Sequence, residues 1–194
     1  MKRARGSLTG GTGDVSPQQY NITLAQPNVD QNDIRTFPVP VYRFPLARDK
    51  AMVMEVLRAQ YYIEDLLVGA AQGSIVGVVS TSKLPIIQTD VSTPAIQYNM
   101  IASPNTFSAF SLDFLFSTGA GFAFTSRIQK EDFTDSAGHG ILIATDTITA
   151  ALMSTGTGTN NRMTIKLIYR WKEVSLSEYI GIVQSQQNPT ASTG

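Results

Sequence analysis

The sequence predicts an all-β domain, and three observations support that prediction. Apolar residues recur at every second position along several stretches, β-branched and aromatic residues gather in short runs, and clusters of Gly, Ser, Pro, Asn or Asp separate those runs. No stretch between the runs has the pattern of a convincing amphipathic helix. A chain of about eight such strands is expected to form a sandwich, a barrel or a jelly roll.

The predicted strands occupy a central domain between two polar ends. Residues 1–33 are rich in Gly, Thr, Gln, Asn and Asp, which predicts a flexible amino-terminal arm. The domain is expected over residues 34–183. Residues 184–194 lack an apolar anchor and predict a flexible carboxyl-terminal tail.

The first half of the domain begins with a proline-containing stretch at residues 34–44. Pro38 and Pro40 cannot donate to a strand ladder, so this strand is expected at a sheet edge or after Pro40, with Phe37, Val39 and Val41 on one side. Residues 51–63 predict a long central strand, although their Met, Glu, Leu, Arg, Ala and Gln also tolerate a helix. Two further strands are expected at residues 74–80 and 95–101.

The second half continues the two-residue period. One strand is predicted with Phe110, Leu112, Phe114 and Phe116 on a single face, and another over residues 121–128. Within residues 140–154 the apolar positions change phase, which predicts a bulge near Thr145 and Asp146. The stretch TGTGTNN, residues 155–161, then predicts a hairpin turn.

The last strand has one apolar and one cationic face. The apolar face contains Met163, Ile165, Leu167, Tyr169 and Trp171, and the other contains Thr164, Lys166, Ile168, Arg170 and Lys172. A sandwich strand turns its apolar face to the opposite sheet. The cations are therefore expected to contact nucleic-acid phosphates, carboxylates of a neighbouring subunit, or solvent, where lysines also prevent sheet-to-sheet aggregation.

The charge is balanced and low. Fifteen Lys and Arg face fifteen Asp and Glu, and charged residues make up 15% of the chain, against about 25% in an average soluble domain. A low charge is expected of a surface that packs against further copies of the chain, because interface cores are depleted of charge. It is equally expected of a secreted β-protein with a polar, uncharged surface.

A small group of cations begins the chain. A flexible positive tip can follow a phosphate backbone without reading bases. Together with the cations of the last strand, this group predicts six nucleic-acid contacts: Lys2, Arg3, Arg5, Lys166, Arg170 and Lys172.

The residues needed for catalysis or metal binding are few. The chain has no cysteine and a single histidine, His139, which two glycines flank, so no rigid nucleophilic triad is expected. The spacing of Asp132, Asp135 and His139 matches no established metal signature. The glycine-rich LTGGTGD is not followed by the Lys-Ser/Thr of a phosphate loop. We expect a protein that is not an enzyme and takes no metal and no cofactor.

Membrane and export signals are missing from the sequence as well. No apolar run approaches the roughly 18 residues of a membrane span, and MKRARGSLTGG lacks the apolar middle of a secretory signal. We expect a soluble protein without membrane insertion.

Residues 138–186 resemble the end of capsid proteins from circovirus-like, Rep-encoding circular single-stranded DNA viruses, especially environmental, unclassified ones. The shared features are a strand containing ATD, a Gly/Thr/Asn turn, a last strand of the IKLIYRWKEV type, and EYIGIVQSQ. Residues 48–63 are similar to the long strand of such capsids. Over residues 34–137 the resemblance is one of pattern.

The resemblance implies a single jelly roll of eight strands in two four-stranded antiparallel sheets. Such proteins assemble as small icosahedral shells, commonly of sixty copies (T=1), around single-stranded DNA, so the chain is expected in the virion, and in the host nucleus or cytoplasm during assembly. Their long arginine-rich arm is here reduced to Lys2, Arg3 and Arg5. Sixty such arms carry roughly 180 positive charges, whereas a genome of one to a few kilobases carries on the order of thousands of negative charges. The arms alone therefore cannot neutralise such a genome. The weak arm also leaves RNA open as the cargo, because small RNA viruses use the same jelly roll.

A second function from another class is left open by the residues. A secreted β-sandwich binding module, lectin-like or a trimeric ligand domain, would use exposed Tyr and Asn/Asp loops to bind a sugar or a receptor. Particles of megadalton mass would support the capsid, and a monomer or trimer would support the binding module.

Overall fold

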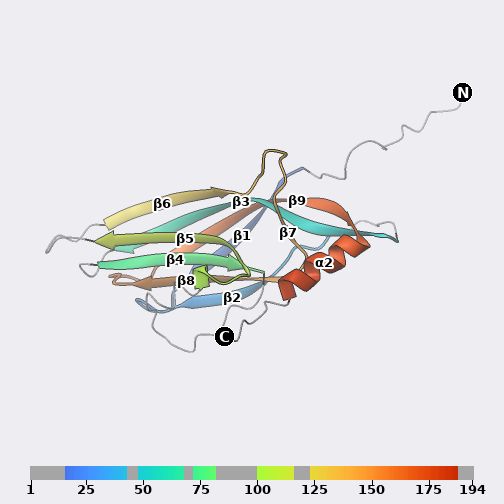
Figure 1. Cartoon of the computed structure of the whole chain (residues 1–194). Helices are drawn as coiled ribbons and strands as arrows, with labels where there is room; N and C mark the ends of the chain where they lie inside the picture. Colours follow the sequence, from blue (N-terminus) through green and yellow to red (C-terminus); the bar gives the residue numbers. More distant parts are fainter. Residues whose placement is uncertain (1–15, 43–47, 68–71, 82–99, 116–122, 188–194) are drawn as a thin grey trace, which may run out of the picture.

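Two antiparallel sheets pack face to face in the computed structural model of the chain (Figure 1). The structure describes residues 16–42, 48–67, 72–81, 100–115 and 123–187. Sheet A has the order β1 (Gln18–Ala25), β9 (Arg162–Ser175), β3 (Lys50–Leu67) and β6 (Ala123–Asp132), with β7 (Ile141–Ile143) also beside β3. Sheet B has the order β2 (Asp33–Pro38), β8 (Thr147–Thr155), β4 (Gln72–Ser80) and β5 (Thr106–Leu115).

The strands β6 and β7 share one position at the edge of sheet A. β7 pairs with residues 54–56 of β3, and β6 pairs with residues 58–67 along the same edge. Each sheet is therefore four positions wide, and the predicted eight-stranded jelly-roll sandwich is confirmed. The long central strand predicted at residues 51–63 is β3, so the helical alternative for this stretch is wrong.

Chain connections near the end of the domain cross from one sheet to the other. Residues 144–146 link β7 of sheet A to β8 of sheet B, and residues 156–161 link β8 back to β9. The predicted bulge at Thr145 and Asp146 and the predicted hairpin at residues 155–161 are both wrong. The apolar phase changes at Thr145 because the strands on either side of it face the core from opposite sheets.

The core between the sheets confirms the alternation predicted for the last strand. All five of its apolar residues are buried there, packed against residues of sheet B such as Ile75, Phe110 and Leu152. Tyr61 of β3 stacks on Phe110 of β5, with ring centroids 5.7 Å apart. Burying one such large side chain stabilises a fold by about 1.5–3 kcal/mol, so this layer dominates the stability of the sandwich.

The amino-terminal boundary of the domain differs from the prediction. β1 pairs with β9 along its whole length, and Ile22 and Leu24 are completely buried. Residues 18–33 are therefore part of the sandwich and not of a flexible arm. Their apolar alternation is only two or three residues long because β1 is an edge strand whose other face is polar. Residues 1–15 lie outside the described part of the chain.

Asp30 ties the turn after β1 to the connection between β8 and β9. Its backbone has a φ of 55°, a conformation that Asp tolerates better than most residues. Its carboxylate accepts hydrogen bonds from the backbone N–H groups of Gly156 and Thr157 and from the hydroxyls of Thr157 and Ser154. This turn closes one end of the sandwich.

A helix ends the described chain, where a tail beginning at residue 184 was predicted. α2 (Leu176–Gln187) begins after Ser175, whose hydroxyl accepts a hydrogen bond from the N–H of Glu178 and so caps the first turn. Near its end, Gln186 donates to the carbonyl of Leu142 at 2.6 Å and accepts from the N–H of Ala144 at 3.0 Å. These bonds hold the helix against β7, so residues 184–187 belong to the folded domain, while residues 188–194 lie outside the described part of the chain. In the described part of the chain, no helix has the length and apolar character that a membrane crossing requires.

Two smaller predictions have mixed outcomes. β2 is an edge strand of sheet B as predicted, but it ends at Pro38, and Val41 is 76% exposed and does not share the apolar side of Phe37. Of the strand predicted at residues 95–101, Met100 and Ile101 are helical, and the remaining residues lie outside the described part of the chain, as does Phe116.

The outer face of sheet B is covered by a second apolar cluster. Val76 and Val78 of β4, Ala151 and Met153 of β8, and Met100 are all buried together there, away from the main core. The corresponding face of sheet A has no such cluster among the described residues. Among the described residues, sheet A is therefore the sheet whose outer face is not closed by a buried apolar cluster.

Candidate nucleic-acid interface

The outer face of sheet A brings a row of polar side chains together across its four strands. Lys166 of β9 lies opposite both Asn21 of β1 and Gln60 of β3, and Gln60 lies opposite Lys130 of β6. Directly opposite residues of antiparallel strands project from the same face. The ladder register thus places two lysines, one on each side of Gln60, on a surface that is open to solvent.

These two lysines have no acidic partner among the described residues. Lys166 instead places its ammonium group 5.3 Å from the centre of the Tyr62 ring, a cation–π contact. The Tyr62 hydroxyl donates a hydrogen bond to the side chain of Gln60, which keeps the Tyr62 ring next to the row of polar side chains. Ile128 of β6, opposite Tyr62, is 54% exposed. We call Gln60, Tyr62, Ile128, Lys130 and Lys166 the open patch.

The next rows of this face contain paired charges. Arg58 binds Asp132 at 2.6 Å, and Arg162 lies 3.9 Å from Glu64. Exposed pairs of this kind contribute at most about 1 kcal/mol to stability. They add no net charge to the face, so the positive potential of the open patch comes from Lys130 and Lys166.

Arg170 and Lys172, both predicted contacts, lie at the other end of the face around a buried carboxylate. Glu55 of β3 is fully buried, Arg170 binds one of its oxygens, and the Lys172 ammonium lies 3.4 Å from the other. The loop from β6 to β7 covers this group, because the N–H of Gly140 donates to Glu55 and the carbonyl of Gly138 accepts from Arg170. Figure 1 shows this loop rising beside β3.

The Glu55 cluster contains one carboxylate and two cationic side chains. Burial alone would raise the pKa of Glu55, but hydrogen bonds from Arg170 and the Gly140 N–H, with the charges of Lys172 and Arg170, bring that pKa below its ordinary value. Glu55 is therefore an anion held by two cations, whose side chains keep 18% and 26% of their surface exposed.

A β-bulge in β3 explains why the face divides into two parts. The pairing with β9 shifts between Val56 and Arg58, so Leu57 has no partner in β9. Before the bulge Glu55 points outward, and after it Arg58 and Gln60 point outward, while Val56 and Ala59 both belong to the core. The bulge separates the loop-covered Glu55 cluster from the open patch.

The sequence-predicted sites thus have three different outcomes. Lys166 lies in the open patch, and Arg170 and Lys172 lie in the Glu55 cluster. Lys2, Arg3 and Arg5 lie outside the described part of the chain. Sequence reasoning missed Lys130 and Tyr62: the strand predicted at residues 121–128 stopped short of Lys130, although alternation continues to Asp132 in β6.

The acids near His139 are occupied by hydrogen bonds. Those from Thr134 and Arg58 hold the pKa of Asp132 well below its usual range, and the N–H groups of His139 and Ala137 lower the pKa of Asp135. His139 also places its ring nitrogen 3.4 Å from Asp135. No group of three or more candidate metal ligands occurs in the described residues.

Comparisons with known proteins complete the description. No protein-family profile and no curated protein matches the chain. Among solved structures, the unassembled VP1 pentamer of KI polyomavirus aligns over 81% of this chain and 95% of its own, at 10% identity and a TM-score of 0.51. VP1 of human polyomavirus 12 with 3'-sialyllactosamine has 10% identity, 82% and 100% coverage and a TM-score of 0.44. Merkel cell polyomavirus VP1 with disialyllactose has 10% identity, 85% and 98% coverage and a TM-score of 0.41.

Such low identity establishes a common fold and nothing about ligands. The KI polyomavirus alignment covers most of each chain. The chain therefore shares the jelly-roll fold of a viral capsid protein.

Proposed function

We propose that the chain is a viral capsid protein that assembles into a closed shell, of sixty copies (T=1), around a single-stranded DNA genome. The observation that carries this proposal is the contrast between the two outer faces of a capsid-type jelly roll. The outer face of sheet B consists of buried apolar residues, whereas that of sheet A presents Lys130 and Lys166 without acidic partners among the described residues. Single-stranded DNA as cargo is supported by the resemblance of residues 138–186 to capsid proteins of circovirus-like viruses.

Genome contact is proposed to be independent of base sequence. The open patch offers lysines for phosphates and one aromatic ring against which an unpaired base can stack, the combination used by proteins that bind single strands without sequence preference. Arg170 and Lys172 would contact phosphates through the part of their side chains that stays exposed beside Glu55. Lys2, Arg3 and Arg5 would follow the phosphate backbone from the end of the chain.

The chain is proposed to act through its surfaces and not through catalysis. In a closed shell each surface patch must meet a complementary patch of another copy. Exposed apolar side chains at Val29, Val41, Leu176 and Ile180 are available for such contacts. The protein would then reside in the virion, after assembly in the host nucleus or cytoplasm.

Assembly is the first test of the proposal. Purified protein is analysed by size-exclusion chromatography with light scattering and by negative-stain electron microscopy, and the nucleic acid that survives nuclease treatment is extracted and identified. We expect closed particles of megadalton mass that protect single-stranded nucleic acid. A monomer or trimer at every salt concentration and pH would contradict the proposal and would favour a binding module.

A truncation separates the arm from the shell. Deletion of residues 1–5 removes three cations and no described contact, so we expect it to lower the nucleic-acid content of particles more than their yield. The ratio of absorbance at 260 to 280 nm of purified particles measures this. An unchanged ratio would show that the arm does not contact the genome.

A further inference from the structure

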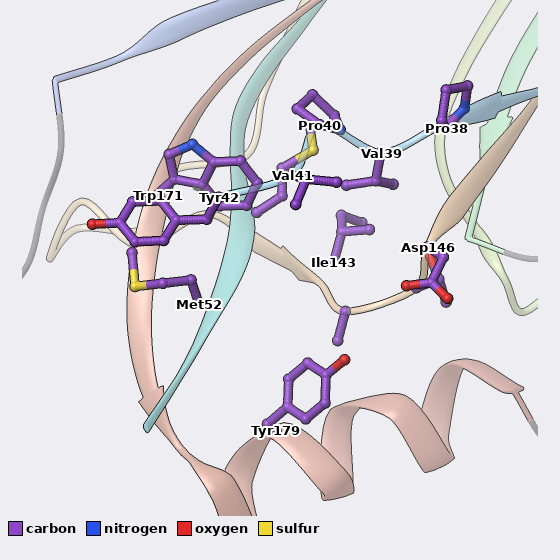
Figure 2. A pocket seen from close by; sticks show the side chains of 13 residues that line it. Pro38, Val39, Pro40, Val41, Tyr42, Met52, Ile143, Asp146, Trp171 and Tyr179 are labelled. Atoms are coloured by element: carbon purple, nitrogen blue, oxygen red, sulfur yellow. The ribbon is translucent and has the colours of Figure 1, made fainter. Parts of the chain in front are cut away.

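A pocket of about 370 Å³ opens at the end of the sandwich that carries α2. It lies between the segment that follows β2, the first part of β3, the crossing from β7 to β8, and α2 (Figure 2). Two bonds fix its walls: the Val39 N–H donates to the carbonyl of Asp146 at 2.8 Å, and Gln186 anchors α2 to β7. Pockets of this size accommodate a small ligand or a side chain.

Aromatic rings line one end of this pocket. Tyr42 and Trp171 meet edge to face, with ring centroids 5.7 Å apart and an interplanar angle of 63°. Tyr179 reaches from α2, and Figure 2 shows its hydroxyl directed toward the space between the other lining residues. Aromatic ring faces carry negative potential and attract cations within about 6 Å of the ring centre.

A carboxylate lies at the other end. Figure 2 shows Asp146 across the pocket from Tyr42 and Trp171. The Asp146 side chain forms no hydrogen bond or ion pair with the other described residues, and none of the thirteen lining residues is cationic. An anionic ligand would be repelled by such a site, whereas a positive ligand would be attracted by the rings at one end and by the carboxylate at the other.

We propose that this pocket binds an organic ammonium group, with the apolar part of the ligand against Val39, Met52 and Ile143 and the charge between the rings and Asp146. The ligand is either a small alkylammonium compound or the side chain of a lysine, which present the same chemistry. The inference does not depend on shell assembly, because the pocket is formed within one copy of the chain.

Trp171 provides a direct reporter, because it is the single tryptophan of the chain. Its fluorescence is titrated with choline and, separately, with 3,3-dimethylbutan-1-ol, which has the same shape without the charge. We expect a saturable change with choline and about three- to tenfold weaker binding of the neutral alcohol, because only the cation gains from the rings and the acid. The preference should weaken at high salt as the carboxylate is screened.

Variants assign the selectivity to named residues. Asp146→Asn and Tyr42→Leu should each reduce choline affinity about three- to tenfold while leaving the affinity for the alcohol nearly unchanged. Asp113→Asn, which removes an exposed acid from β5 in sheet B, is the matched control and should change neither titration. Circular dichroism of each variant confirms that it is folded.

Several results would overturn the proposal. Absence of a saturable change with choline up to about 100 mM, equal affinity for both probes, or choline binding that survives both Asp146→Asn and Tyr42→Leu would each exclude an ammonium site here. N-acetyl-lysinamide then identifies the source of the ligand: tighter binding than choline indicates a lysine side chain, and weaker binding indicates a small methylated ammonium. Either order is consistent with the site, and neither bears on whether shells form.

Discussion

The outer faces of the two sheets differ although both sheets have the same width. β9 of sheet A alternates buried and partly exposed positions almost without interruption, whereas residues 148–154 of β8 in sheet B are buried without a break. A strand that is covered on both faces has no reason to alternate. Apolar alternation in a strand therefore indicates that the outer face of its sheet is open to solvent. Here that sheet is sheet A, which carries Lys130 and Lys166.

The largest expected effect comes from a charge placed on each face in turn. Val78→Asp puts a carboxylate into the buried cluster outside sheet B, and we expect a loss of roughly 4 kcal/mol or more in the free energy of unfolding, because the charge is desolvated without a partner. Ile168→Asp, the control on the outer face of sheet A, lies beside Arg58 and should change stability by less than about 1 kcal/mol. Urea unfolding measures both, and equal losses would show that the faces are equally covered.

The next effect concerns the covered part of sheet A. Glu55→Gln leaves Arg170 and Lys172 partly buried without their carboxylate, and we expect a loss of about 2–4 kcal/mol in the free energy of unfolding. Lys130→Gln, which removes an exposed charge from the same sheet, is the control. A loss of less than about 0.5 kcal/mol would show that the cluster does not stabilise the loop between β6 and β7.

The same carboxylate predicts a pH dependence. The pKa of Glu55 is lowered in the folded protein, so its stabilising contribution is complete above the ordinary glutamate pKa and is lost as the pH falls through the lowered value. Wild-type stability should therefore decrease at acidic pH more steeply than that of Glu55→Gln. Unfolding curves between pH 7 and 3 test this, and parallel profiles would contradict it.

A smaller effect sharpens the role of the open patch. Lys130→Gln together with Lys166→Gln removes two charges without acidic partners among the described residues, and the slope of log affinity for single-stranded DNA against log salt should become less negative by about 1 to 1.5. The control is the paired change Arg48→Gln and Lys50→Gln, just before β3 and at its first residue, because it removes the same number of positive charges as the lysine pair. If both pairs lower the slope alike, binding follows net charge and not this face.

The smallest effect tests stacking. Tyr62→Leu keeps an apolar side chain but removes the ring, and we expect about 1 kcal/mol weaker binding of single-stranded DNA with an unchanged salt slope. Tyr20→Leu, on the core side of β1, is the control and should leave DNA binding unaltered. A change in salt slope with Tyr62→Leu would mean that the ring acts only by positioning Lys166.

Much of this architecture could be predicted from local pattern. The apolar face of residues 163–171 and the central position of β3 follow from residue periodicity alone. The crossings at residues 144–146 and 156–161 could not be predicted, because a change of sheet and a bulge shift the apolar phase in the same way. Edge strand β1 was missed because only its inner positions, such as Ile22 and Leu24, are apolar.

The candidate site was less predictable than the fold. Lys166, Arg170 and Lys172 are on one strand face as expected, but nothing local to them indicates that Glu55, 115 residues before Arg170, is buried between two of them. Lys130 and Tyr62 join Lys166 only through the pairing of β3 with β6 and β9. Such contacts depend on register, which periodicity within a single strand does not define.

Leu57, the extra residue of the β3 bulge, bears on how much variation β3 tolerates. The bulge accommodates this one residue, so that Glu55 and Gln60 both face outward while Val56 and Ala59 both face the core. Deleting Leu57 would leave these four residues in regular alternation and in the same register with β9, whereas deleting a single residue elsewhere in the middle of β3 would turn the apolar side of part of the strand outward. We therefore expect β3 to tolerate the loss of this leucine better than the loss of a neighbouring residue.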